Sequence, residues 1–158
     1  MQCAKVLQFP DYTEELAREV AKNFAGEKID IVLAPAIGGI VWGYELARAL
    51  SAKSIFAERE DGKMLLRRGF EIPRGARVVV AEDVITTGGT VVEILEIAKA
   101  HDAIIAGVGV IVDRSGGKVQ LGTKIAAALS TEIISFPPDD CPLCKQGLPI
   151  TKPGSRAV

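Results

Sequence analysis

The stretch that decides the fold is Arg77 to Val92, which reads Arg-Val-Val-Val-Ala-Glu-Asp-Val-Ile-Thr-Thr-Gly-Gly-Thr-Val-Val. Its apolar run, Val78 to Ala81, is short and mostly β-branched, which is typical of a parallel strand buried on both faces. Two carboxylates follow this run, and a turn of small residues, Thr86 to Thr90, follows the carboxylates. A helical apolar pattern comes next, carried by Val91, Leu95 and Ala98. The stretch therefore predicts a buried strand, an acidic pair, a loop and a helix.

The predicted loop has the composition of a phosphate site. Gly88 and Gly89 let the backbone approach a ligand closely, and the free amides at a helix start favour an anion. Glu82 and Asp83 would repel a bare phosphate, so they need another partner, either sugar hydroxyls or a hard cation such as Mg²⁺. The loop and the acidic pair together predict a sugar phosphate.

A purely structural alternative is a capping box, in which Thr90 and Glu93 satisfy the first amides of the helix and the glycines only make the turn tight. We prefer the ligand interpretation, because capping explains neither Glu82 nor Asp83.

Composition limits the class of protein. With 158 residues and 48% hydrophobic content, the chain predicts one domain over residues 1–158. The net charge of −1 argues against a dedicated nucleic-acid surface. The chain has no apolar run of the roughly 20 residues that span a bilayer, and its first residues have no secretory pattern. Three cysteines without a signal segment fit a reducing cytoplasm.

The remaining pattern predicts alternating strands and helices. Asp11 and Glu14 form a candidate capping box for a first helix that ends at Gly26. Another helix follows the glycine turn at residues 36–39, and it carries Trp42, Leu46, Ala49 and Leu50 on one face. We expect a mostly parallel five-stranded sheet with helices on both faces; its other strands are Ile29 to Ala34, Ser54 to Glu58, Ala103 to Val112 and Glu132 to Phe136, with a short helix over Gly122 to Leu129.

A second glycine turn, Ala36 to Gly39, joins the strand at residues 29–34 to the following helix. The carboxyl ends of parallel strands gather at one edge of a sheet, where ligands bind. This turn is therefore a second candidate ligand loop, and a simple glycine turn is the alternative.

The segment Arg59 to Gly69 carries four cations and two anions around Asp61-Gly62, which is a strong hairpin signal. One interpretation is a solvated β-ribbon whose charges protect a sheet edge. The other is a mobile basic arm that closes over an anionic leaving group. The residues alone leave both open.

Asp113-Arg114 follows the predicted strand at residues 103–112. The fork of donors on an arginine at a strand end can hold a planar anion. The alternative is a structural role, in which Asp113 forms a salt bridge with a neighbour.

Cys141-Pro142-Leu143-Cys144 is an isolated Cys-x-x-Cys. It indicates zinc or redox chemistry only with a second ligand pair or a thioredoxin-like context, and Cys3 and His101 are the only other soft ligands. Two reduced thiols are the default expectation.

Glu82 to Thr90 resembles the phosphoribosyl pyrophosphate motif of the type I phosphoribosyltransferases, and Gln2 to about Arg156 resembles the orotate phosphoribosyltransferases. The resemblance implies a type I phosphoribosyltransferase-like fold and Mg²⁺-dependent transfer of ribose 5-phosphate from phosphoribosyl pyrophosphate to orotate. The products would be orotidine 5′-monophosphate, an intermediate of UMP synthesis, and pyrophosphate. It also implies a homodimer in which the flexible catalytic loop, residues 59–69, acts at the neighbouring subunit's site.

The resemblance implies roles for individual residues. Catalytic roles fall to Glu82, Asp83, Lys63 and Arg59, and orotate binding falls to Thr86 and Arg114. The protein itself would supply no metal site, since Mg²⁺ is held through substrate oxygens. Phosphoribosyl pyrophosphate would contact the acidic pair and the residues Val84, Ile85, Thr86, Thr87, Gly88, Gly89 and Thr90, together with Ile37 and Gly38 of the second loop.

Several positions depart from the family pattern. The second loop lacks the lysine that family members often carry, because Ile37 and Gly38 occupy that region. Met64 and Leu65 stand where the catalytic loop commonly has a histidine, and His101 follows a helix instead. The family usually begins further upstream of Gln2, which implies either a reduced hood or a native segment that is missing from this sequence. Residues 137–158 would be an irregular tail that helps to cover the site.

Rival functions remain. A phosphoribosyltransferase for another base, such as a purine, would not need the carboxylate-binding fork of Arg114. A non-catalytic regulator would keep the fold and bind nucleic acid or a partner protein, and one that binds nucleic acid should show a basic surface. A dinucleotide dehydrogenase is excluded, since no Gly-x-Gly-x-x-Gly follows the first strand.

Overall fold

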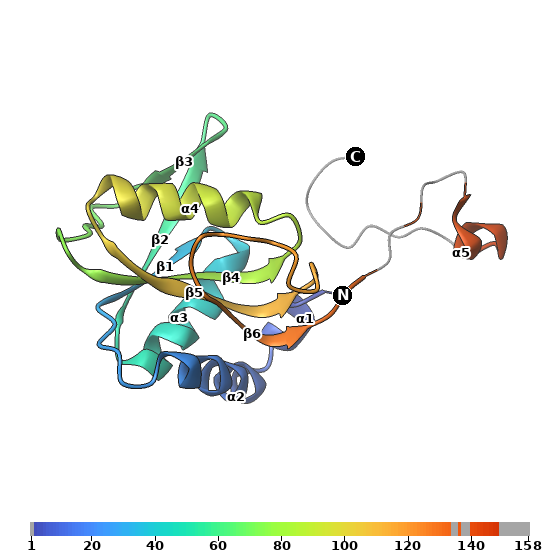
Figure 1. Ribbon diagram of the computed structural model, residues 1–158, viewed down its shortest axis with the longest axis horizontal. Helices are drawn as coiled ribbons and strands as arrows, with labels where there is room; N and C mark the ends of the chain where they lie inside the picture. The colour runs from blue at the N-terminus through green and yellow to red at the C-terminus, as the bar shows by residue number, and fades with distance from the viewer. Residues whose placement is uncertain (1, 134–135, 137–139, 149–158) are drawn as a thin grey trace.

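The computed structural model describes residues 2–133, 136 and 140–148. Within them a six-stranded sheet has the order β3-β2-β1-β4-β5-β6 (Figure 1). Neighbouring strands pair in parallel, except that β3 is antiparallel to β2. The strands are β1 (Ile31–Pro35), β2 (Lys53–Glu60), β3 (Lys63–Leu66), β4 (Arg77–Ile85), β5 (Ile104–Asp113) and β6 (Ile125–Ser130). The mostly parallel α/β sheet is confirmed, with one more strand than expected.

Helices cover both faces of the sheet (Figure 1). One face carries α2 (Pro10–Ala21) and α3 (Gly38–Leu50), and the other carries α4 (Gly89–Ala100). The shorter helices are α1 (Ala4–Leu7), η1 (Lys22–Phe24) and α5 (Pro142–Lys145). None of the helices in the described ranges has the length and apolarity needed to cross a bilayer.

Close packing of α3 against the sheet depends on two glycines. A Cβ added to Gly43 would lie 2.7 Å from the Cβ of Ala34, and one added to Gly109 would lie 2.6 Å from Cδ2 of Leu46. The fully buried Trp42 donates from Nε1 to the carbonyl of Gly109 at 3.0 Å, which satisfies its polar atom. The predicted inner face of this helix is confirmed for Trp42 and Leu46, whereas Ala49 is exposed.

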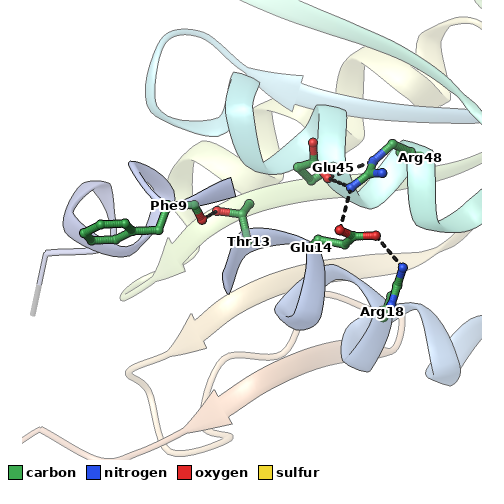
Figure 2. A network of polar contacts seen from close by, with 6 residues as sticks. All are labelled: Phe9, Thr13, Glu14, Arg18, Glu45 and Arg48. Atoms are coloured by element: carbon green, nitrogen blue, oxygen red, sulfur yellow. Dashed lines mark hydrogen bonds and ion pairs between the residues drawn. The ribbon is translucent and has the colours of Figure 1, made fainter. Parts of the chain in front are cut away.

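The predicted capping box of the first helix is wrong. The N-cap of α2 is Phe9, with Pro10 in the first turn and no side-chain cap. Glu14 instead accepts from Arg18 on its own helix and lies 3.4 Å from Arg48 of α3, which also pairs with Glu45 (Figure 2). This carboxylate thus links the two helices on their solvent side. Pro10 begins the helix because it already lacks the amide that a cap would satisfy.

The predicted helix over Gly122 to Leu129 is also wrong, since residues 125–130 form strand β6. Alanine favours helix in isolation, but Val108 to Asp113 of β5 offer an open edge, and β6 pairs with it in parallel. The strand expected over Glu132 to Phe136 is not formed where the chain is described: Glu132 makes one isolated bridge to Ser115, and residues 134–135 lie outside the described residues. Tertiary pairing overrides local propensity here.

The Asp61-Gly62 hairpin is confirmed. Strands β2 and β3 pair from Ala57 with Leu66 to Glu60 with Lys63, and both turn residues have positive φ, 49° and 81°. The segment at residues 59–69 therefore begins as a two-stranded ribbon at the sheet edge.

Candidate active site at the carboxyl edge of the sheet

The strands β1 and β4 are neighbours in the centre of the sheet, and the chain leaves them toward opposite faces. After β1 it enters α3 on one face, and after β4 it enters α4 on the other (Figure 1). This divergence is the topological switch point of an open α/β sheet, where a crevice forms beyond the carboxyl ends of the strands. Both predicted ligand loops, residues 36–39 and 86–90, therefore lie at this switch point.

Strand β4 is longer than predicted and runs to Ile85, so Glu82 and Asp83 lie within the strand and not after it. Glu82 is buried, with 9% of its surface exposed, and Asp83 is half-buried. Backbone amides fix both carboxylates: the amide of Asp83 donates to Oε1 of Glu82 at 3.1 Å, and the amide of Val84 donates to Oδ1 of Asp83 at 2.9 Å. The acidic pair is thus held at the strand end before any ligand binds.

The loop after β4 has the form expected of an anion site. Gly88 is the N-cap of α4, has a φ of 81° and provides no side-chain cap. Thr86, Thr87 and Gly89 are exposed, whereas Gly88 is buried beneath Val119 and Leu121. A Cβ on Gly89 would meet nothing nearer than Oγ1 of Thr87 at 4.0 Å, so space for a ligand lies beside this residue.

The alternative capping box of Thr90 and Glu93 is not formed, because the N-cap is Gly88 and Glu93 accepts from Arg59 at 2.8 Å. Capping by the Thr90–Glu93 pair therefore does not account for the loop sequence.

The second loop is built in a similar way. The amide of Ala36 donates to the carbonyl of Ala57 at 2.7 Å, and the peptide bond between Ala36 and Ile37 is cis. Ile37 is 85% exposed, and a Cβ on Gly38 would meet no atom within 4 Å. A Cβ on Gly39, by contrast, would lie 2.9 Å from Cδ of Pro35. Gly39 is thus needed for packing, whereas Gly38 leaves space open at the site.

Arg114 follows β5, and its amide donates to the carbonyl of Ile85 at 2.9 Å, which ties it to the end of β4. Its Nε is buried, and it has no hydrogen-bond partner within the described part of the chain. An unsatisfied buried donor costs about 1–3 kcal/mol. The guanidinium of Arg114 therefore has a donor at the carboxyl edge of the sheet that can bind an acceptor on a ligand.

The alternative of a structural salt bridge at Asp113 does not hold among the described residues. Asp113 is 3% exposed and accepts from the Ser115 amide and hydroxyl at 2.8 and 2.6 Å, from Gly117 at 3.2 Å and from Ser130 at 3.2 Å. Burial raises the pKa of Asp113, but the hydrogen bonds from Ser115, Ser130 and Gly117 together lower it below its ordinary value. The carboxylate fixes the loop that follows Arg114.

Cys3 brings the first residues of the chain to the site. Its thiol is 3% exposed and donates to the carbonyl of Asp83 at 3.8 Å. Burial, and then the charge of Asp83, raises the pKa of Cys3 to about 11, while Arg114 acts in the opposite direction. Asp83 and Arg114 therefore both lie close to one neutral thiol.

The predicted catalytic cations lie on the hairpin. Arg59 contacts both the turn, at the carbonyl of Gly62, and α4, at Glu93. Lys63 is exposed and makes no ion pair with any described residue. The structure thus brings Arg59 to the helix that follows the phosphate loop and leaves Lys63 in solvent.

Sequence reasoning missed the structural role of Asp113 and the partner of Arg59. The spacing Asp113-x-Ser115-x-Gly117 is a side-chain turn signal that could have indicated the first. No local pattern could have paired Arg59 with Glu93, 34 residues away. Within the described ranges no group of three or more His, Cys, Asp or Glu residues could hold a metal ion.

Comparison with known proteins identifies the family. The family model described as Phosphoribosyl transferase domain matches residues 6–137. The chain is 56% identical over 157 residues to the orotate phosphoribosyltransferase of Pelotomaculum thermopropionicum, covering 99% of this chain and 83% of that protein. It is 54% identical over 156 residues to the orotate phosphoribosyltransferase of Caldicellulosiruptor bescii, covering 99% and 82%.

Solved structures agree on the fold. Adenine phosphoribosyltransferase from Thermoanaerobacter pseudethanolicus superposes with a TM-score of 0.72 at 19% identity, covering 82% of this chain and 86% of that one. Orotate phosphoribosyltransferase from Aeropyrum pernix gives 0.68 at 21% identity, covering 82% and 75%. With the sheet order, the acidic pair and the loop at the switch point, these matches show that the chain belongs to the orotate phosphoribosyltransferase family within the type I phosphoribosyltransferase fold.

Proposed function

We propose that this protein transfers ribose 5-phosphate from phosphoribosyl pyrophosphate to orotate, giving orotidine 5′-monophosphate and pyrophosphate. The observation that carries the choice of base is Arg114, whose buried Nε has no partner among the described residues and whose backbone is tied to the end of β4. Orotate carries a carboxylate that a guanidinium fork can bind, whereas purines carry none.

Each loop has a separate task in this proposal. The 5′-phosphate binds the amides and hydroxyls of Thr86 to Thr90 at the start of α4, and the pyrophosphate binds the backbone around Ile37 and Gly38. Glu82 and Asp83 accept from the ribose hydroxyls. As the leaving group departs, positive charge builds on the ribose carbon, and the nearby carboxylates stabilise it.

The carboxylates of Glu82 and Asp83 suit a divalent ion that is held mainly by the substrate. Glu82 and Asp83 offer carboxylate oxygens at a strand end, but the described residues supply no third acidic or histidine ligand beside them. Mg²⁺ is commonly bound through one or two carboxylates plus substrate phosphates. When bound, it would neutralise charge on the departing pyrophosphate. The chain's own contribution is to orient the ribose hydroxyls that share the ion.

We also propose a homodimer in which Arg59 and Lys63 act on the pyrophosphate at the neighbouring subunit's site. Three large apolar side chains, Ile37, Val41 and Tyr44, lie 85%, 49% and 62% exposed at helical spacing along the start of α3. Such a stripe beside a ligand loop favours a protein contact. Lys63 has no ion-pair partner in its own described chain, so it is available to a partner's ligand. A cytoplasmic location is proposed with it, in keeping with three free thiols.

The test is a reaction panel. Purified protein, phosphoribosyl pyrophosphate and Mg²⁺ are incubated with orotate, uracil, adenine or hypoxanthine, and the nucleotide product is identified. We expect orotidine 5′-monophosphate alone, and no product without the divalent ion.

Arg114→Ala should lose about 2–4 kcal/mol of orotate binding with little change for phosphoribosyl pyrophosphate, and Arg114→Lys should recover only part of this loss. Preference for uracil or a purine, or equal loss of both substrates, would overturn the assignment.

A further inference from the structure

The pair Cys141 and Cys144 takes no part in the proposed transferase reaction, and it lies on the short helix α5 outside the sheet layers (Figure 1). Both thiols are free and half-buried. Cys141 is the N-cap of α5 and Cys144 is its third residue, so the two residues face each other across the first turn. The Cα atoms of positions i and i+3 in a helical turn lie about 5 Å apart, within the range that a disulfide spans.

The backbone of Cys144 contacts the sulfur of Cys141. The amide of Cys144 donates to Sγ of Cys141 at 3.4 Å. Hydrogen bonding from the Cys144 amide lowers the pKa of Cys141, and the neighbouring Cys141 side chain, followed by burial, raises the pKa of Cys144. One sulfur is therefore arranged as the nucleophile and the other as the group that holds a proton until it is needed.

We propose that Cys141 and Cys144 form a thiol–disulfide exchange site for small disulfides of the glutathione disulfide class. The Cys141 thiolate attacks one sulfur of the small disulfide, the disulfide bond breaks, and one small thiolate leaves. The Cys144 thiol then loses its proton to solvent and attacks Sγ of Cys141, which forms the intramolecular disulfide and releases the second small thiol. The protein dithiol is oxidised by two electrons, and the small disulfide is reduced to two thiols.

Cys3 provides an internal contrast. It is 3% exposed, and burial raises its pKa to about 11, so it is neither reachable nor ionised at neutral pH. Cys3 should therefore react only after unfolding, whereas Cys141 and Cys144 should react in the folded protein.

The experiment uses the full chain in glutathione buffers of increasing disulfide fraction, followed by acid quench, alkylation and intact-mass and peptide analysis. We expect wild type to lose its two tail thiols together as an intramolecular disulfide while Cys3 stays alkylatable after unfolding. Cys144→Ser should trap a glutathione adduct on Cys141, and Cys141→Ser should trap none. Iodoacetamide should modify Cys141 at least about tenfold faster than Cys144.

Cys3→Ser is the matched control and should behave as wild type in the exchange. The proposal is overturned if both tail thiols stay reduced throughout the buffer series, or if Cys144→Ser forms no adduct. It is also overturned if the adduct appears equally on Cys144 in Cys141→Ser. Transferase activity is not a readout, so failure here leaves the proposed function standing.

Discussion

At the scale of single residues, Gly38 and Gly89 allow the two proposed binding loops to be tested separately, since Gly38 lies in the pyrophosphate loop and Gly89 in the 5′-phosphate loop. Each is the first residue of its helix, and beyond the adjacent residues and the helix's own backbone, a Cβ added to either would meet no atom closer than 4.0 Å. Alanine is also the better helix former, so neither substitution should weaken the fold. Gly88 is not suitable for the same substitution, because its φ is 81° and an added Cβ would lie 3.0 Å from Cγ1 of Val119.

We predict that Gly89→Ala weakens ribose 5-phosphate binding by about tenfold or more, because a methyl group would force the phosphate off amides that form charged hydrogen bonds worth about 1.5–3 kcal/mol. Gly38→Ala should leave ribose 5-phosphate unaffected and weaken only phosphoribosyl pyrophosphate, which alone carries the pyrophosphate. Calorimetry with both ligands checks this, with thermal unfolding as the control for folding. Equal loss of ribose 5-phosphate in the two variants would refute the division of the loops.

Asp113 gives a prediction about stability. Its carboxylate accepts four hydrogen bonds, and Asn can reproduce only those made by one oxygen. Asp113→Asn should therefore lower the free energy of unfolding by about 1–3 kcal/mol near neutral pH. The folded-state pKa is lowered, so the ionised group stabilises the fold above its unfolded pKa of about 4, and this contribution disappears as the pH falls through the folded value.

Urea unfolding at several pH values measures this effect. The difference between wild type and Asp113→Asn should be constant above about pH 5 and shrink on acidification. Asp102→Asn is the matched control, since among the described residues the Asp102 side chain forms an ion pair only with Arg74, at an exposed position. A difference independent of pH would mean that the variant acts through packing and not through charge.

At the scale of elements, the hairpin β2–β3 is held against α4 by Arg59, and this contact must break if the arm serves another subunit. Arg59 and Glu93 are 42% and 41% exposed in their side chains, so the pair contributes at most about 1 kcal/mol. Hydrogen bonding to Glu93 also raises the pKa of Arg59, so the guanidinium stays charged. Glu93 thus competes weakly with pyrophosphate for one cation.

If the arm acts in the neighbouring site, Glu93→Gln should lower the KM for phosphoribosyl pyrophosphate by up to about fivefold, since a contact of about 1 kcal/mol no longer holds the arm back. Glu96→Gln, on the same helix and paired with Lys99, should change nothing. Initial rates at saturating orotate measure both. A higher KM in Glu93→Gln would instead mean that the observed pair holds Arg59 in its working position.

The elements predicted correctly from sequence are those whose pattern is set by local chemistry. The Asp61-Gly62 turn needs two positive φ values, and the strand at β4 needs a β-branched run, so both can be read from neighbouring residues. The Ala-rich segment at residues 125–130 cannot, because its strand state depends on the edge of β5. The predicted capping box of Asp11 and Glu14 failed for a similar reason, since Glu14 pairs with Arg18 and with Arg48 of another helix. Glu93, from the alternative capping box that we did not favour, likewise pairs with Arg59 on another element.

At the scale of the whole molecule, the site is a consequence of strand order. The loops at residues 36–39 and 86–90 are about 50 positions apart in sequence, and only the adjacency of β1 and β4 brings them to one edge. The alternation of strands and glycine turns predicted that edge, since carboxyl ends of parallel strands gather there. The orphaned Nε of Arg114 was not predictable, because burial of one atom depends on every layer around it.

Assembly of two chains leads to the last prediction. If the arm of one subunit completes the site of another, a chain with a defective arm and a chain with a defective pocket can together form one intact site. Lys63→Ala removes one exposed cation of the arm, and Asp83→Asn removes a carboxylate of the pocket. Each variant alone should be inactive, while random exchange in an equal mixture makes half of the dimers mixed, with one intact site of two. The mixture should therefore regain about a quarter of wild-type specific activity, measured as release of pyrophosphate.

A mixture of Lys63→Ala with Arg59→Ala is the control, since both changes lie on the arm and no combination repairs them. Absence of recovery in the first mixture, once differently tagged subunits are shown to exchange, would assign the arm to its own subunit and leave Arg59 acting beside Glu93.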